Sequence, residues 1–464
     1  MDSVKSNNDN DLNDLNEKVN NMSIDKHKRI CSFCLKDVDG SSRCGKCMTA
    51  LYCNRECQKK HWSVHKHRCM DSNGGEDSDE NLFSKAINHM NQGSNQKAER
   101  MLNRLLTRVR VSRGENHQFT LDVMNALAAS FAHQHKYTDA AALYEECWKR
   151  KKVVYGENHR NTLMSMSNLS NIYTSQGRIN EAVILLKECL IRMKLVLGEN
   201  DPFTLSCMVS LANCYDSQKK YTESEALYKK CLALQKTVIN ENDNIQISVM
   251  RTKSNLVINY VNQSRYIEAE VLGKEVLNER MSVLGVNHCD TLNSMSSLAR
   301  IYNNLERYDE ALSLLKECLT KRKLVLGENA HETLETMHNY ALTLQRKGNH
   351  SEATVLFKQA YDKMKIVYGE NAPRTLQCMS GLASSYFKQA EAGINDVYNY
   401  TQAEGLFREC LAIRKSVLGE NAPDTLDTMN ELGSTCDKLE KYTEAESLFL
   451  DLSLIHISEP TRPY

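Results

Sequence analysis

The part of the chain best suited to chemistry is a cluster of cysteines and histidines between residues 31 and 69. Thiolate and imidazole groups favour zinc over hard cations such as calcium or magnesium. Eight such groups suffice for two tetrahedral sites, and a zinc ion closed by four protein ligands is structural rather than catalytic. We therefore predict two structural zinc ions per chain. The candidate ligands are Cys31, Cys34, Cys44, Cys47, Cys53, Cys57, His65 and Cys69.

The elements that carry these ligands are short. A segment of about 40 residues buries too little apolar surface to fold alone, so we expect metal binding to supply much of its folding free energy. Residues 1–25 before it are rich in Asn and Asp, and we expect a disordered tail. Residues 71–81 after it are acidic and contain glycine, which predicts a flexible linker.

Three short phrases in the cluster resemble the MYND zinc finger: Leu51-Tyr52-Cys53, Cys57-Gln58 and Trp62-x-x-His65-Lys66-x-x-Cys69. The resemblance implies that the finger binds short proline-containing peptides of partner proteins. It also implies an interleaved arrangement, which the spacing alone does not show. In this arrangement Cys31, Cys34, Cys53 and Cys57 hold zinc 1, and Cys44, Cys47, His65 and Cys69 hold zinc 2.

The composition argues against several classes of partner. The 59 basic and 59 acidic residues cancel, so net charge gives no general attraction to nucleic acid or to an anionic membrane. The finger is itself basic, which leaves nucleic acid as the weaker alternative to a protein partner. The N-terminus lacks the apolar core of a secretory signal, and no apolar run approaches about 20 residues. We expect an intracellular protein, in the cytoplasm rather than the nucleus.

From residue 82 the chain is periodic. Apolar residues follow i, i+3, i+4, i+7 spacing on two faces, separated in one period by Gln176-Gly177-Arg178, so each period predicts a helix–turn–helix. Gly198 suits a left-handed helix end, and Asp201-Pro202 suits the start of the next helix. Most intervals between Gly-Glu-Asn phrases are 42 residues, which indicates stacked repeats. The phrases begin at Gly114, Gly156, Gly198, Gly327, Gly369 and Gly419.

The repeat resembles the tetratricopeptide repeat, and its length and Leu-Gly-Glu-Asn phrases are similar to the kinesin light chain subtype. The predicted fold class is all-α: a right-handed α-solenoid of about eight 42-residue hairpins over residues 82–451, preceded by the two-zinc finger. We expect an atypical opening hairpin (82–113), seven full repeats and a truncated eighth. One set of matching positions is Met295, Leu298, Ala299, Tyr302, Ala311, Leu315 and Cys318.

Two further sets of residues recur at fixed phases of the repeat. Five cysteines share one phase of the second helix, and we interpret them as small buried core residues rather than as a redox or metal site. They are Cys147, Cys189, Cys231, Cys318 and Cys410.

First helices line the concave groove in this family, and the side chains expected there are mostly Asn and Ser. Amides can pair with the backbone of an extended peptide, although a solvated polar side chain is the simpler interpretation of any single one. The candidate groove residues are Asn125, Asn171, Asn213, Asn293, Arg300 and Asn430.

Two stretches depart from the pattern. In the fourth repeat Asn240 replaces glycine and Lys253 takes a large apolar position, so we expect a weak repeat and a bend there. Residues 452–464 correspond to the translation of a common sequencing adapter. We interpret them as a cloning or assembly artefact that interrupts the last helix after Leu450, and we expect the natural chain to continue differently.

The favoured hypothesis is a non-enzymatic, zinc-binding adaptor or scaffold whose finger and repeat groove each bind protein segments. One alternative is a kinesin light chain-like cargo adaptor. Such an adaptor would need a heptad-repeat segment to dimerise with a heavy chain, and no heptad segment precedes the array. The other alternative is the remnant of a MYND-containing protein lysine methyltransferase. The flanks of the finger are too short for a SET domain, which argues against this alternative. No nucleophile–base pair or phosphate-binding loop stands out in the sequence.

Overall fold

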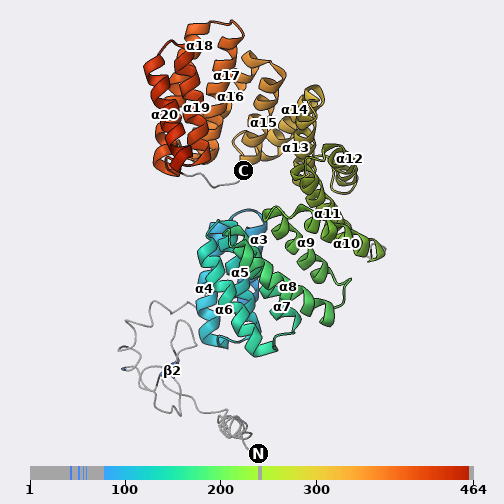
Figure 1. Cartoon of the computed structure of the whole chain (residues 1–464). Helices are drawn as coiled ribbons and strands as arrows, with labels where there is room; N and C mark the ends of the chain where they lie inside the picture. Colours follow the sequence, from blue (N-terminus) through green and yellow to red (C-terminus); the bar gives the residue numbers. More distant parts are fainter. Residues whose placement is uncertain are drawn as a thin grey trace, which may run out of the picture. The chain divides into compact units, whose positions relative to one another are not determined.

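The computed structural model of the chain describes residues 42–43, 51–52, 56, 59, 78–238 and 243–458. The chain divides into two units, residues 1–134 and residues 135–464. Within the described ranges, every regular element longer than two residues is an α-helix (Figure 1). The predicted all-α class is therefore confirmed.

The first unit contains a two-stranded sheet and three helices. Strand β1 (Ser42–Arg43) pairs antiparallel with β2 (Leu51–Tyr52), with Arg43 opposite Leu51. The helices are α3 (Asp79–Asn91), α4 (Asn95–Arg113) and α5 (Gln118–His133). Helices α3 and α4 form the predicted opening hairpin, which begins three residues earlier than expected. The Ser78 side chain accepts a hydrogen bond from the Asn81 amide, and acidic residues follow it in the first turn, so the helix starts there.

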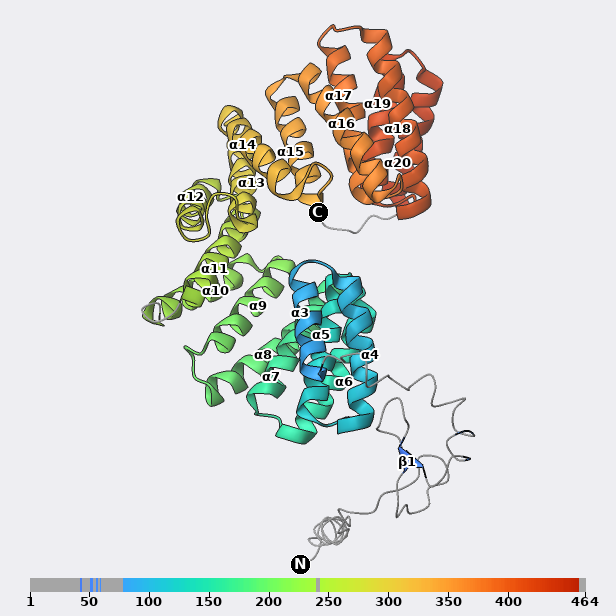
Figure 2. The same cartoon turned by 180° about the vertical axis from the view of Figure 1, so that it is seen from behind.

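The second unit is a succession of antiparallel helices, each packed against the next along the chain (Figures 1 and 2). Counted along the chain from α3 to α20, the helices suffice for an opening hairpin and eight further hairpins, in agreement with the predicted number of about eight. The helices are α6 (Tyr137–Tyr155), α7 (Arg160–Ser175), α8 (Ile179–Val196), α9 (Pro202–Ser217), α10 (Tyr221–Val238), α11 (Asp243–Asn262), α12 (Tyr266–Val283), α13 (Cys289–Asn304), α14 (Tyr308–Leu326), α15 (His331–Lys347), α16 (His350–Tyr368), α17 (Pro373–Glu391), α18 (Asp396–Leu418), α19 (Pro423–Lys438) and α20 (Tyr442–Ser458).

The apolar faces predicted for one repeat are buried as expected. Leu163 and Leu169 of α7 and Leu186 of α8 are each at most 1% exposed. The tight turn between the two helices contains Gly177 at φ +76°, a conformation that glycine adopts at little cost. Burial of both faces against neighbouring hairpins is what makes a single repeat dependent on the next.

The Gly-Glu-Asn phrases connect one repeat to the next. Gly156 and Gly419 have φ near +90° with ψ near 165°, a positive-φ conformation that is open to glycine but is not the left-handed helical one. Gly198 also has a positive φ, +92°, so the predicted need for glycine holds there, while the predicted left-handed helix end stays a prediction. At the start of α9, Asp201 accepts a hydrogen bond from the Phe203 amide at 2.8 Å, and Pro202 occupies the first turn, which confirms the predicted cap.

The fourth repeat accommodates its irregular lysine. Lys253 is only 8% exposed, and its Nζ lies 2.7 Å from Glu275 Oε1 and also contacts Glu279 on α12. Burial alone would lower the pKa of Lys253, but the two carboxylates offset this and raise it. The charge of Lys253 is therefore compensated inside the repeat. The bend expected there stays a prediction. Asn240 lies outside the described residues.

The longer spacing before Gly419 appears as an extended hairpin. Helix α17 has 19 residues and α18 has 23, and Asn395 between them adopts a left-handed conformation. Asn399 is 3% exposed and donates to the Ile394 carbonyl oxygen at 2.6 Å, which ties the inserted turn to itself. The insertion thus lengthens one hairpin at its tip.

The last helix does not stop where the sequence predicts. Helix α20 runs through Leu450 to Ser458, into the segment interpreted as an adapter translation. Leu452 packs against the neighbouring apolar cluster. Helical conformation does not report where these residues came from, so the artefact interpretation stays a prediction.

Candidate functional site

The eight predicted zinc ligands lie outside the described residues. The structure describes the β1–β2 pair between them, and each strand directly precedes a predicted ligand in sequence, Cys44 after Arg43 and Cys53 after Tyr52. The ligand assignment and its interleaving therefore stay predictions. The donor set itself, seven thiols and one imidazole, has the chemistry that a zinc ion requires.

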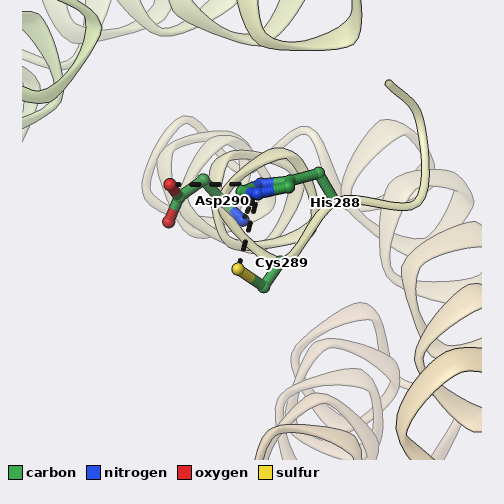
Figure 3. A group of neighbouring side chains, drawn as sticks. All are labelled: His288, Cys289 and Asp290. Atoms are coloured by element: carbon green, nitrogen blue, oxygen red, sulfur yellow. Dashed lines mark hydrogen bonds and ion pairs between the residues drawn. The ribbon is translucent and has the colours of Figure 1, made fainter. Parts of the chain in front are cut away.

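Within the described ranges, His288, Cys289 and Asp290 form a group with metal-binding side chains (Figure 3). Cys289 Sγ and Asp290 Oδ2 lie 3.8 Å and 4.0 Å from the same atom, His288 Nδ1. That nitrogen already accepts a hydrogen bond from the Asp290 amide at 3.2 Å, which caps α13. The lone pair is used by the backbone, so the arrangement is a helix cap rather than a metal site.

The same cap recurs at the start of other repeats. His117 accepts from the Phe119 amide and His159 from the Asn161 amide, both at 3.2 Å. Asp201 performs this role before α9. The histidine caps were not predicted, although their signal is present in the sequence: each follows a Gly-x-Asn phrase directly, at the position that Asp201 occupies.

A second group, Glu404, Cys436 and Glu444, is occupied by cations of the chain itself. Glu404 is 4% exposed, and Lys441 Nζ lies 2.6 Å from its Oε1. Arg408 bridges Glu404 and Glu444 at 2.8 and 2.6 Å. These ion pairs join the last two hairpins and explain the cluster without a metal.

The recurring cysteines of the second helices are buried and free, which confirms their interpretation as core residues. Cys189 donates to the Leu163 carbonyl oxygen at 3.3 Å, and Cys318 donates to that of Leu292 at 3.4 Å. Within the part of the chain that the structure describes, Cys289 is the one exposed cysteine.

The predicted groove residues have different environments. Asn293 and Arg300 both line a hollow of about 520 Å³ formed by α13, α14 and α15. Asn171 on α7 and Asn430 on α19 are exposed, and Asn125 on α5 is half-buried. The structure therefore brings two of the six candidates together in one cavity.

Asn213 is engaged by the protein itself. Its Oδ1 accepts from the buried Tyr228 hydroxyl at 2.5 Å and from Asn255 Nδ2 at 3.1 Å. The Tyr228 hydroxyl also donates to Asp216 Oδ2 at 3.0 Å, and Asn259 Nδ2 donates to Asp216 Oδ1. This polar network joins the third and fourth repeats, so Asn213 has a structural contact that its position in the sequence did not indicate.

Buried arginines are the polar residues that the sequence analysis overlooked. Arg280, Arg322 and Arg414 share one phase of the second helix and are 4–8% exposed. Each guanidinium donates to a backbone carbonyl and to a Ser or Thr hydroxyl at the start of the next repeat. Burial lowers the pKa of Arg280. Their common phase in the repeat is the signal that could have revealed them.

A second set of arginines connects repeats on the surface. Arg265 lies over the Tyr260 ring at 4.5 Å and pairs with Glu225 of the preceding repeat at 2.6 Å. Arg307 lies over Tyr302 at 4.6 Å and pairs with Glu270 at 2.8 Å. Arg265 and Arg307 thus have carboxylate partners, whereas Arg300 and Arg322 of the hollow have none among the described residues.

None of the helices in the described ranges combines the length and the hydropathy that crossing a bilayer requires.

Two families match this chain. The tetratricopeptide repeat family matches residues 80–152, 127–194, 175–237, 248–323, 290–366, 332–392 and 398–452. The MYND finger family matches residues 31–69. The repeats therefore account for most of the chain and the finger for a small part of it.

The curated relatives are similar to this chain over the finger. N-lysine methyltransferase SMYD2 of Homo sapiens is 40% identical over 48 residues, 10% of this chain and 11% of that protein. SMYD2-B of Xenopus laevis is 51% identical over 39 residues, 8% and 9% of the two chains. The chain spans about a tenth of the length of these relatives.

Solved structures are similar to the repeat array. A signal transduction ATPase with a tetratricopeptide repeat sensor from Pyrococcus horikoshii has a TM-score of 0.55 at 15% identity, covering 83% of this chain and 53% of that one. The apo form of RapI has a TM-score of 0.53 at 12% identity, covering 82% and 99%. A putative kinesin light chain from Podosopora anserina has a TM-score of 0.39 at 23% identity, covering 44% and 96%. At these identities the likeness to the first two structures shows the fold alone.

Proposed function

The chain belongs to the tetratricopeptide repeat family, and from this premise we propose that it is a non-enzymatic adaptor that holds protein segments through both its repeat groove and its finger. The observation that carries the proposal is the hollow on α13 to α15. There, amide and guanidinium groups of successive repeats face one cavity, a suitable surface for an extended peptide.

The finger supports the same role. A MYND finger implies zinc binding, and we propose two ions, with Cys31, Cys34, Cys53 and Cys57 at one site and Cys44, Cys47, His65 and Cys69 at the other. Zinc supplies folding free energy to such a module when bound. With four protein ligands at each ion, no position is open for a substrate, so we assign the finger to peptide binding rather than to catalysis.

Two other functions remain alternatives. A methyltransferase origin is supported only by the similarity of the finger, about a tenth of each chain. A kinesin light chain-like cargo adaptor would use the same repeat groove and differs from our proposal in its partner. Both alternatives predict specific partners or products, so the experiment below separates them from a general adaptor.

Proximity labelling with the full chain tests the proposal. We would compare the wild type with a groove variant, Asn171→Asp with Asn293→Asp, and a finger variant, Cys53→Ser with Cys57→Ser. We expect two groups of captured proteins, one lost in each variant. Identical capture by all three chains would contradict the proposal, and enrichment of kinesin heavy chain or methylation of a captured protein would favour the corresponding alternative.

A further inference from the structure

The hollow on α13 to α15 contains three guanidinium groups, contributed by Arg300, Arg322 and Arg346. Arg322 is 4% exposed and is held in place by the Glu332 carbonyl oxygen, Thr336 Oγ1 and Asn293 Oδ1. Arg300 and Arg346 are exposed and come from successive first helices. One cation is thus held by hydrogen bonds, and the other two are exposed to solvent.

The positive charge of this hollow is not compensated. Among the described residues, no carboxylate forms an ion pair with Arg300, Arg322 or Arg346. Glu335 also lines the hollow, but it pairs with Arg374 at 3.0 Å. By contrast, the surface arginines Arg265 and Arg307 each pair with a carboxylate of the preceding repeat. An anionic ligand is the partner that these three groups lack.

An amide acceptor in the same hollow is also unsatisfied. Asn303 Nδ2 donates to Thr343 Oγ1 at 2.8 Å. Asn303 Oδ1 is shut off from solvent and has no hydrogen-bond partner within the described residues. A buried acceptor without a donor is costly, so a turn of the Asn303 side chain toward a donor in the hollow is favourable.

We propose that this hollow binds a phosphorylated serine or threonine side chain of a partner peptide. A phosphate carries a charge of about −1.5 to −2 and three acceptor oxygens, which match three guanidinium donors better than the single charge of a carboxylate does. Once its side chain turns into the hollow, the Asn303 amide oxygen accepts a backbone N–H of the same peptide. This proposal rests on the proposed peptide-binding function and specifies its ligand.

Fluorescence anisotropy with the full zinc-loaded chain tests the ligand. Peptides would be selected from an oriented phosphoserine and phosphothreonine library and resynthesised in phosphorylated, unphosphorylated and Glu-substituted forms. We expect the phosphorylated form to bind about tenfold or more tightly than either of the others. Arg300→Gln with Arg346→Gln should abolish that difference. The matched control, Lys316→Gln with Lys358→Gln, removes the same two charges from exposed sites on α14 and α16 and should preserve it.

Equal affinity of the phosphorylated and unphosphorylated forms would overturn the proposal. So would equal affinity of the Glu-substituted form, which would make the hollow a carboxylate site, or an undiminished preference in the arginine variant. The peptide-binding function itself would survive these results if unphosphorylated peptides bind and the groove variant of the labelling experiment still loses partners.

Discussion

At the residue scale, one histidine packed between α15 and α16 is held neutral. His338 on α15 packs edge-on against Phe357 with ring centroids 5.4 Å apart, and its Nδ1 is shut off from solvent without a partner in the described ranges. Burial lowers the pKa of His338 to about 4. The unfolded chain, with a pKa near 6.5, therefore binds a proton that the folded chain excludes between these values.

This difference predicts a loss of stability in acid. The neutral His338 side chain makes its full contribution to the free energy of unfolding above about pH 6.5. As the pH drops to about 4, this contribution falls by about 1.4 kcal/mol per pH unit and by at most about 3 kcal/mol in all. His338→Gln should reduce the slope of the unfolding free energy against pH over this window, with the free energy measured by urea denaturation. The exposed His133→Gln serves as the control and should retain the wild-type slope. An unchanged slope in His338→Gln would contradict the assignment.

At the element scale, two helical glycines are matched tests of packing. A Cβ built on Gly381 of α17 would lie 2.8 Å from Phe357 Cε1, and Phe357 is fully buried. A Cβ on the exposed Gly405 of α18 meets nothing within 4 Å. A small residue is thus required at position 381, where α17 meets the Phe357 ring of the preceding hairpin, and not at position 405.

Alanine substitution should separate these two cases. We expect Gly405→Ala to stabilise by about 0.5–1 kcal/mol, because alanine favours the helix. Gly381→Ala gains the same propensity but overpacks the core at a cost of about 1–3 kcal/mol, so we expect no net gain or a destabilisation. Thermal unfolding followed by circular dichroism measures both changes. A stabilised Gly381→Ala would mean that Phe357 moves aside freely.

The sequence predicts most of these elements because their signals are local. Glycine, proline and apolar spacing locate the helices, and the 42-residue period counts the hairpins. Interactions between repeats were harder to predict. Arg322 looks like a surface residue until the next repeat supplies its carbonyl partner, and Asn213 looks solvated until Tyr228 and Asn255 reach it. Such partners lie 10 to 42 residues away, beyond the reach of helical periodicity.

At the scale of the whole molecule, the cysteines predict a three-stage thiol count. The chain has 17 cysteines, of which nine in the described ranges are buried and Cys289 is exposed. The remaining seven are the predicted zinc ligands. We expect one fast-reacting thiol in the zinc-loaded protein, seven more after chelation and the last nine only after unfolding in denaturant.

Metal analysis and circular dichroism complete this test. Zinc analysis should give about two ions per chain, and chelation should leave most helical signal intact because each repeat depends only on its neighbours. Cys289→Ser is the control and should remove the fast thiol alone. Fewer than one zinc ion per chain, or eight fast thiols before chelation, would contradict the finger assignment.

The extended hairpin of α17 and α18 has a practical consequence. Its extra residues lie at a tip, and Asn399 secures them through the Ile394 carbonyl, while Leu382 and Cys410 keep their buried positions below. The tip therefore tolerates added length without disturbing the register of the array. A fluorescent reporter or an epitope inserted next to Gly393 would label the protein internally without replacing any residue of the proposed binding surfaces.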